Sequence, residues 1–405
     1  MKKLLEISLG VVTAVGGFLE AGSLATAVQA GAAFRFQLLW AVALGTICVA
    51  VLMEMSGRLA AVSGHTLADA MRERFGFVFF LVPLVMVGIV SVLTLAAELG
   101  GVCMALSLAI GLDFRWFAVP VMVLAWAILW RGSFGVIEKG VSLLGLVTVA
   151  FLVAAIKLHP PLGEAAKGLL VSHPTHEASH YWFLAVSILG ASLTPYLFYF
   201  YSSGAIEDEW DEGFLGINRV VAGVGMMFGG ILSAAVLLVA AMVFWPRGVR
   251  IERYDQIATM LTDAFGSWGF PIFVACLAIA CFGAVLEIAV TMAYLVAQGL
   301  GWNWGKNVRP REAARFSITY TLCLVLATGL VAIGLDPLRL TNVTMTLSAA
   351  VLPVAVVPFI VLMNDRDYVG AHGNGRVSNA FVLGVIALAC VLALVSLPLQ
   401  LMGSS

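Results

Sequence analysis

Eleven long apolar stretches divide this chain, and they constrain its fold more than any other feature of the sequence. Most of them reach about 18 residues, the length that a helix needs to cross about 30 Å of hydrocarbon. They cover residues 7–33, 38–62, 78–110, 116–131, 136–157, 181–203, 217–245, 268–300, 313–334, 340–363 and 379–401. Only 11% of the 405 residues are charged, far fewer than a soluble domain of this length requires. The sequence therefore predicts an all-α, polytopic membrane protein that contacts the lipid bilayer along most of its length.

The longest polar connections between these stretches, 158–180 and 246–267, are of moderate length. We therefore expect residues 1–405 to form a single transmembrane domain with no soluble domain appended. The formal net charge of −1 gives no basis for binding nucleic acid. The six cysteines lie within apolar stretches and show no CxxC spacing, which is typical of small buried side chains. No motif brings a serine, a histidine and an aspartate together, so we expect no enzyme.

The distribution of lysine and arginine predicts the orientation. A cytoplasmic N-terminus places fourteen of the 22 lysine and arginine residues on the inner side and the other eight on the outer side. Cytoplasmic loops carry the excess of positive charge in membrane proteins. We therefore expect a multi-pass protein of a bacterial plasma (inner) membrane, with its N-terminus in the cytoplasm and its C-terminus outside.

A polar stretch interrupts the first apolar segment at Gly16-Gly17-Phe18-Leu19-Glu20-Ala21-Gly22-Ser23. A carboxylate near the bilayer centre is costly, roughly 2.5 to 3.5 kcal/mol on insertion scales for the comparable aspartate. Glu20 should therefore face protein, water or a cation. The glycines beside it allow the helix to open and to turn carbonyl groups inward. Two interpretations remain open: a glycine-rich helix contact with a neutral glutamate, and a broken helix that holds a cation.

The sixth segment has a matching interruption at residues 190–196, where Pro195 removes a backbone donor and frees carbonyl groups near Ala191. Paired interruptions at corresponding places in two halves are typical of an inverted-repeat transporter with its site at the midplane. We therefore expect helices 1 and 6 to be broken there. The predicted units are a first repeat at about 5–157, a second at about 180–363 and an extra helix at about 379–401.

Motifs in both halves of the chain support this arrangement. They are GGFLEAGSLATAVQAGAAF in the first segment, VSGHTLADAMRERF at 62–75, TLAAELGGVCMAL at 94–106, GASLTPYLFYFYSS at 190–203, and the five-residue spacing of Pro353 and Pro358. Together they resemble the Nramp family of divalent-metal transporters. The resemblance implies the LeuT-type 5+5 inverted repeat, with about eleven transmembrane helices, and alternating access to a metal site.

The same resemblance implies a set of metal ligands. The family's ligand positions fall on the side chains of Glu20, Ser23 and Thr194 and on the carbonyl groups of Gly17 and Ala191. The methionine thioether that the family supplies from its sixth helix is absent, so every ligand implied here is an oxygen atom. Oxygen donors suit Mg²⁺, Mn²⁺ or Ca²⁺. The pattern resembles the Nramp-related magnesium transporter branch, with Mg²⁺ or Mn²⁺ as the transported substrate and no resident cofactor.

The residues that carry protons in the family also differ in this chain. Two histidines of the sixth helix become Tyr196 and Tyr201, and the aspartate before Glu98 becomes Leu95. A tyrosine, whose unperturbed pKa is about 10, cannot replace a histidine that titrates near neutrality. We therefore expect passive transport or weak proton coupling.

Three further side chains are candidates for the permeation pathway. Glu98 and Glu287 lie within apolar segments, where each carboxylate faces the path or forms a hydrogen bond inside the helix bundle. Met345 stands, by the proline spacing, where the family has a glutamine, with Thr344 beside it. The sequence does not choose between these roles.

Several features allow a second interpretation. A small organic solute, such as an amine or amino acid, could use the same fold, and the aromatic run 198–201 would suit it.

His173, His176 and His180 are interpreted as solvent-facing loop residues rather than a metal-collecting cluster. The acidic run 204–213 is interpreted as a solvated surface, with attraction of cations as the alternative. The sequence does not indicate an oligomeric state.

Overall fold

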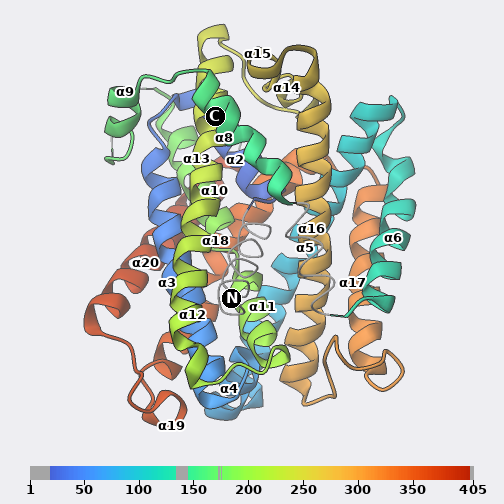
Figure 1. The fold of residues 1–405 in the computed structure, drawn as a ribbon, viewed down its shortest axis with the longest axis vertical. Helices are drawn as coiled ribbons and strands as arrows, with labels where there is room; N and C mark the ends of the chain where they lie inside the picture. The colour runs from blue at the N-terminus through green and yellow to red at the C-terminus, as the bar shows by residue number, and fades with distance from the viewer. Residues whose placement is uncertain (1–18, 134–144, 172–173, 175, 402–405) are drawn as a thin grey trace.

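The computed structural model describes residues 19–133, 145–171, 174 and 176–401, and this part of the chain is helical with connecting loops (Figure 1). The helices are α2 (Ala21–Phe34), α3 (Leu39–Ser63), α4 (Leu67–Phe75), α5 (Phe77–Ile110), α6 (Ala118–Arg131), α8 (Val149–Lys157), α9 (Leu162–Lys167), α10 (Ala178–Ser192), α11 (Pro195–Glu207), α12 (Leu215–Val220), α13 (Met226–Val243), α14 (Tyr254–Ile257), α15 (Thr262–Phe265), α16 (Gly269–Leu300), α17 (Ala314–Ala332), α18 (Pro337–Leu362), α19 (Arg366–Val369) and α20 (Arg376–Leu401). The short helices α9, α14 and α15 lie at one end of the bundle, and α4 and α19 lie at the other (Figure 1). These two ends are called the α14 end and the α4 end below.

Nine helical stretches in the described residues are long and apolar enough to cross a membrane. They coincide with nine of the eleven predicted segments, with boundaries that differ by a few residues at most ends. The other two predicted segments, 7–33 and 136–157, lie partly outside the described residues. Their described parts form α2 and the shorter apolar helix Leu146–Lys157.

The sixth predicted segment consists of two helices, as expected. Helix α10 ends at Ser192, and α11 begins at Pro195, which occupies the first helical position. Thr194 between them is not helical, with φ −57° and ψ 124°. Proline is favoured at the first position of a helix because its missing N–H has no intrahelical partner there. The predicted break in helix 6 is therefore confirmed.

The chain is also non-helical at Glu20, where the predicted break in helix 1 falls. Glu20 is extended, with φ −118° and ψ 178°, and α2 starts at the next residue. Ser23 Oγ accepts a hydrogen bond from the Glu20 N–H at 3.0 Å and lies 3.1 Å from the Glu20 carbonyl oxygen, to which it donates. The serine thereby satisfies backbone groups that the start of a helix leaves without partners. Gly17 and the rest of residues 1–18 lie outside the described part of the chain.

Helix α2 is buried on all sides, packed against α13, α10 and α18. Glycines make these close approaches possible. A Cβ atom at Gly31 would overlap the Leu237 carbonyl oxygen of α13, and one at Gly190 of α10 would overlap the Met345 carbonyl oxygen of α18. Small residues at such contacts let helix backbones approach closely in membrane proteins. These close approaches hold α2 against α13 and α10 against α18.

Candidate metal site

The Glu20 carboxylate faces the break in helix 6. The Tyr196 hydroxyl donates to Glu20 Oε2 at 2.6 Å, and Thr194 Oγ1 lies 3.4 Å from Glu20 Oε1. Thr194 immediately precedes α11 and Tyr196 lies in its first turn. Glu20 is only 2% exposed. The residues that sequence reasoning placed at the two breaks are therefore in direct contact.

A second carboxylate lies beside the first. Glu98 of α5 is fully buried, and its Oε2 accepts a hydrogen bond from the Ala21 N–H at 3.0 Å. Its Oε1 has no hydrogen-bond partner among the described residues. The first turn of α2 thus lies between two acidic side chains, one from its own N-terminus and one from α5.

Neither Glu20 nor Glu98 forms an ion pair with a lysine, arginine or histidine in the described part of the chain. A buried carboxylate without a counter-charge is costly, so it needs a proton or a bound cation. The hydroxyl groups of Tyr196 and Thr194 supply hydrogen bonds but no charge. The site therefore suits either a protonated carboxyl group or a bound cation.

The other predicted oxygen ligands lie around this carboxylate. Thr194 Oγ1 is 3.0 Å from the Ala191 carbonyl oxygen and 3.2 Å from that of Gly190. Ser23 is 3% exposed and bonds to the Glu20 backbone, as described above. The structure thus brings Glu20, Ser23, Thr194 and Ala191 together, while Gly17 lies outside the described residues. No group of three or more His, Cys, Asp or Glu side chains suited to an ion occurs among the described residues.

A thioether approaches the same place from α18. The side chain of Met345 is fully buried. A Cβ atom at Gly22 would lie 2.5 Å from Met345 Sδ and 2.8 Å from its Cε, so the sulfur rests on the first turn of α2. The sequence argument named Met345 as a candidate for the permeation pathway but did not count its sulfur among the ligands. The structure adds a soft sulfur atom next to Gly22, between Ala21 and Ser23 in the first turn of α2.

A thiol also lies at this site, which sequence reasoning missed. A Cβ atom at Gly101 would lie 2.7 Å from Cys281 Sγ and 3.6 Å from the Ala21 Cβ. The Cys281 thiol of α16 lies beside the Glu98 carboxylate. Cys281 was interpreted from the sequence as a small packing residue, and its spacing offered no signal, because its neighbours here come from α2 and α5.

The remaining predicted pathway residues lie in different surroundings. The Tyr201 hydroxyl donates to Asn218 Oδ1 at 3.1 Å, away from Glu20. Glu287 of α16 is 4% exposed and lies close enough to Tyr196 for an electrostatic interaction. The ring of Phe198 stacks on Phe359 with centroids 6.0 Å apart. Part of the aromatic run therefore serves helix packing, whereas roles for Tyr201 and Glu287 in the pathway stay predictions.

The acidic run at the end of α11 is a solvated surface at Asp208, Glu209, Asp211 and Glu212, which are exposed, but not at Glu207. Glu207 accepts hydrogen bonds from the Tyr294 hydroxyl at 2.8 Å and from the backbone N–H groups of Lys306 and Asn307. Lys306 is 7% exposed, and its Nζ donates to the Leu129 carbonyl oxygen. Burial lowers the pKa of Lys306 to about 8. Glu207 thus ties the end of α11 to the loop between α16 and α17.

The comparison with known families decides the assignment. Residues 10–398 match the sequence model of Nramp, described as natural resistance-associated macrophage protein-like. The chain belongs to the Nramp family. This match confirms the prediction that the chain belongs to a family of membrane transporters. It also confirms the expectation that the chain is not an enzyme.

Similar curated proteins extend over nearly the whole chain. A protein named divalent metal cation transporter MntH from Aeromonas hydrophila is 26% identical over 387 residues, covering 92% of this chain and 90% of that protein. A protein of the same name from Deinococcus radiodurans is 25% identical over 411 residues, covering 97% of this chain and 89% of that protein. Both relatives are bacterial proteins, which agrees with the predicted location in a bacterial membrane.

Solved structures confirm the fold of this Nramp protein. The manganese transporter of Eremococcus coleocola is similar with a TM-score of 0.80 at 19% identity, covering 97% of this chain and 86% of that chain. Mhp1, a nucleobase-cation-symport-1 family transporter, is similar with a TM-score of 0.65 at 13% identity, covering 97% of this chain and 92% of that chain. These similarities confirm the predicted LeuT-type architecture. The boundaries of the two repeats stay a prediction.

Proposed function

We propose that this Nramp protein transports a divalent metal cation, Mg²⁺ or Mn²⁺, by alternating access around Glu20. One observation carries the proposal: the buried Glu20 carboxylate lies where the two helix breaks meet and has hydroxyl donors but no cationic partner among the described residues. A bound cation supplies the missing charge. The names of the MntH relatives, divalent metal cation transporters, support the same activity.

The nature of the ligands supports a hard ion. Glu20, Ser23 and Thr194, with the carbonyl groups of Ala191 and Gly17, offer only oxygen atoms, which suit Mg²⁺ and Mn²⁺. A single carboxylate with neutral oxygens fits Mg²⁺ in particular, because this ion gives up its water reluctantly and retains several water ligands in most sites. We therefore place the chain in the magnesium-transporting branch of the family, with Mn²⁺ as the second substrate.

We further propose that transport is passive or only weakly coupled to protons. Tyr196 uses its hydroxyl to hold Glu20, and Tyr201 uses its hydroxyl to hold Asn218. Neither side chain takes up and releases protons near neutral pH as a histidine does. Stoichiometric acidification of vesicles during metal uptake that is lost in Glu98→Gln would contradict this part of the proposal.

The proposed orientation follows the charge distribution, with the N-terminus in the cytoplasm and the C-terminus outside a bacterial inner membrane. It places the α14 end outside and the α4 end inside the cell. Opening of each end in turn, through rocking of the broken helices, would expose Glu20 first to one side and then to the other.

Calorimetric titration of the detergent-solubilised protein tests the proposed substrate. We expect Mg²⁺ and Mn²⁺ to bind to the unsubstituted protein and not to Glu20→Gln, which keeps the size of the side chain and removes its charge. Glu73→Gln is the matched control, because the Glu73 side chain is 58% exposed and contacts His65 instead of the breaks. Absence of binding by either ion, together with flux of an amine or amino acid, would favour the organic-solute alternative.

A further inference from the structure

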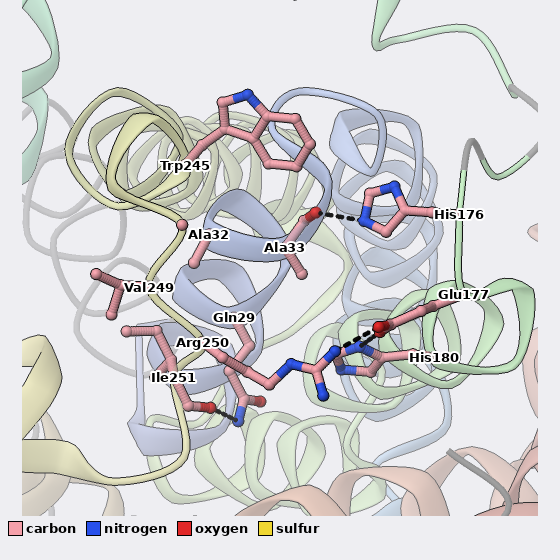
Figure 2. Close-up of a pocket in the computed structure, with 11 residues that line it drawn as sticks. Gln29, Ala32, Ala33, His176, Glu177, His180, Trp245, Val249, Arg250 and Ile251 are labelled. Atoms are coloured by element: carbon pink, nitrogen blue, oxygen red, sulfur yellow. Dashed lines mark hydrogen bonds and ion pairs between the residues drawn. The ribbon is translucent and has the colours of Figure 1, made fainter.

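A pocket of about 270 Å³ lies at the α14 end, between α2, the start of α10 and the loop that follows α13 (Figure 2). Its wall on α2 includes Gln29 and Ala32. Gln29 follows Glu20 by nine residues, which is about 13 Å along a helix at 1.5 Å per residue. We call this pocket the vestibule. It lies at the end of α2 that is remote from Glu20, and the pathway described above does not include it.

One residue that lines the vestibule, Gln29, carries an unsatisfied oxygen atom. Gln29 is 9% exposed, and its Nε2 donates to the Ile251 carbonyl oxygen at 3.2 Å. Its Oε1 is buried and has no hydrogen-bond partner in the described part of the chain. Buried amide oxygens nearly always have a partner. An amide oxygen is also a ligand that divalent cations accept, directly or through their bound water.

A carboxylate and an arginine meet at the rim of the same pocket. Arg250, in the loop after α13, forms an ion pair with Glu177, the residue before α10 (Figure 2). His180 Nδ1 lies 3.4 Å from the other oxygen of Glu177. The guanidinium group therefore occupies the position that a cation arriving at this carboxylate would take.

We propose that the vestibule is a transit site for the divalent cation, with Glu177 and Gln29 as its oxygen ligands and Arg250 as a tethered cation that closes it. The inference rests on the proposed function and adds a second site for the same substrate. The Arg250 and Glu177 side chains are 60% and 42% exposed, and such an ion pair changes an equilibrium by at most about fivefold. This ion pair between Arg250 and Glu177, called the latch below, is thus weak enough for a divalent cation to displace.

The loop after α13 contacts both α2 and α10, and these contacts support the role of Arg250 and Glu177 as a latch. The loop after α13 contacts α2 through the Ile251 carbonyl and α10 through Arg250. His176, one residue before Glu177, bonds the Ala33 carbonyl oxygen at 3.1 Å and stacks on Phe34 at the end of α2. Movement of α10 away from the loop must separate Arg250 from Glu177 and widen the vestibule.

Cysteine labelling tests the latch independently of transport. The reporter is Ala32→Cys, because Ala32 lines the vestibule and is only 6% exposed. We expect a maleimide to react with this cysteine up to about fivefold faster in detergent when Arg250→Gln or Glu177→Gln is added. The matched control is Arg253→Gln, on the same loop, where the arginine pairs with Asp255 instead. Each of these three substitutions is combined with Ala32→Cys. Equal labelling rates in the three double variants would overturn the latch.

Uptake of Mn²⁺ by intact cells tests the ligand role of Glu177. Arg250→Gln should lower the external Mn²⁺ concentration that gives half-maximal uptake, because it uncovers the carboxylate. Glu177→Gln should raise that concentration several-fold, although it opens the latch equally well. Shifts in the same direction, or no shift relative to Arg253→Gln, would overturn the transit site. Absence of any Mn²⁺ uptake by the unsubstituted protein would instead overturn the proposed function, and the transit site with it.

Discussion

The Tyr196 hydroxyl donates a hydrogen bond to Glu20 Oε2 at 2.6 Å and so joins the two broken helices of the bundle. Both residues are buried, at 0% and 2% exposure. This bond gives the carboxylate a donor while no cation is present. It also fixes the carboxylate against the start of α11, where Thr194 and the Ala191 carbonyl offer further oxygen atoms.

Replacing Tyr196 with phenylalanine should destabilise the metal-free protein. The change leaves a buried carboxylate oxygen without its donor, which costs about 1–3 kcal/mol. Saturating Mn²⁺ should restore most of this loss, because the cation then satisfies the same oxygen. Thermal unfolding with and without Mn²⁺ measures both effects. Tyr199→Phe is the control, since its hydroxyl donates to a weak acceptor, Met71 Sδ, and not to a carboxylate. An equal loss in the two variants would show that the Glu20 bond has no special role.

Replacing Gly190 with alanine should disturb the packing of α18 against α10. The added methyl group would overlap the Met345 carbonyl oxygen, which is backbone and cannot turn aside. Overpacking of this kind costs about 1–3 kcal/mol, and Mn²⁺ uptake should fall as the site deforms. Gly329→Ala on α17 is the control, because among the described residues no atom outside its own stretch of helix lies within 4 Å of the added methyl group. Unfolding temperatures and uptake rates of the two variants compare the effects, and equal values would contradict this packing.

The sequence predicted the parts of the site that local chemistry marks. A glutamate within an apolar run, with glycines beside it, indicated the first break, and Pro195 indicated the second. The contact between Glu20 and Thr194 followed from the family resemblance, which aligned the two breaks. The nine spans in the described residues followed from the length of apolar runs alone.

Contacts between distant segments could not be predicted in the same way. Cys281 and Met345 reach α2 because Gly101 and Gly22 leave room for their sulfur atoms. Cys281 does not stand out in its own helix, where it is one apolar residue among many. The proline spacing marked Met345 as a candidate but did not show that its sulfur reaches α2. Likewise Glu207 belongs to an acidic run that favoured a solvated surface, and only the fold shows its bonds to the loop at Lys306. Apolar periodicity does not specify which helix lies against which.

The thioether of Met345 should affect soft ions more than hard ones. Its sulfur rests on the first turn of α2, beside the proposed oxygen ligands. Soft thioether ligands favour soft metal ions, whereas Mg²⁺ selects oxygen. We therefore expect Met345→Leu to lower the affinity for Cd²⁺ several-fold and to leave that for Mg²⁺ within about twofold. Titration calorimetry with each ion measures this, and an equal loss for both would assign Met345 a purely structural role.

The stability of the protein should depend on Lys306 in alkaline solution. Burial lowers the pKa of Lys306 in the folded protein from 10.5 to about 8. Between these pH values the unfolded chain binds the proton and the folded protein does not, so this residue makes stability rise with pH. The unfolding temperature of the unsubstituted protein should therefore rise, relative to that of Lys306→Met, from pH 8 to about pH 10. Parallel curves for the two proteins would contradict the buried lysine.

The most direct test of the account is the position of the transported ion. Anomalous diffraction from crystals soaked in Mn²⁺ should show a peak between the Glu20 carboxylate and the Thr194–Ala191 break, and the peak should be absent in Glu20→Gln crystals. A strong peak elsewhere in the membrane-spanning part, with none at Glu20 in a protein that takes up Mn²⁺, would contradict it.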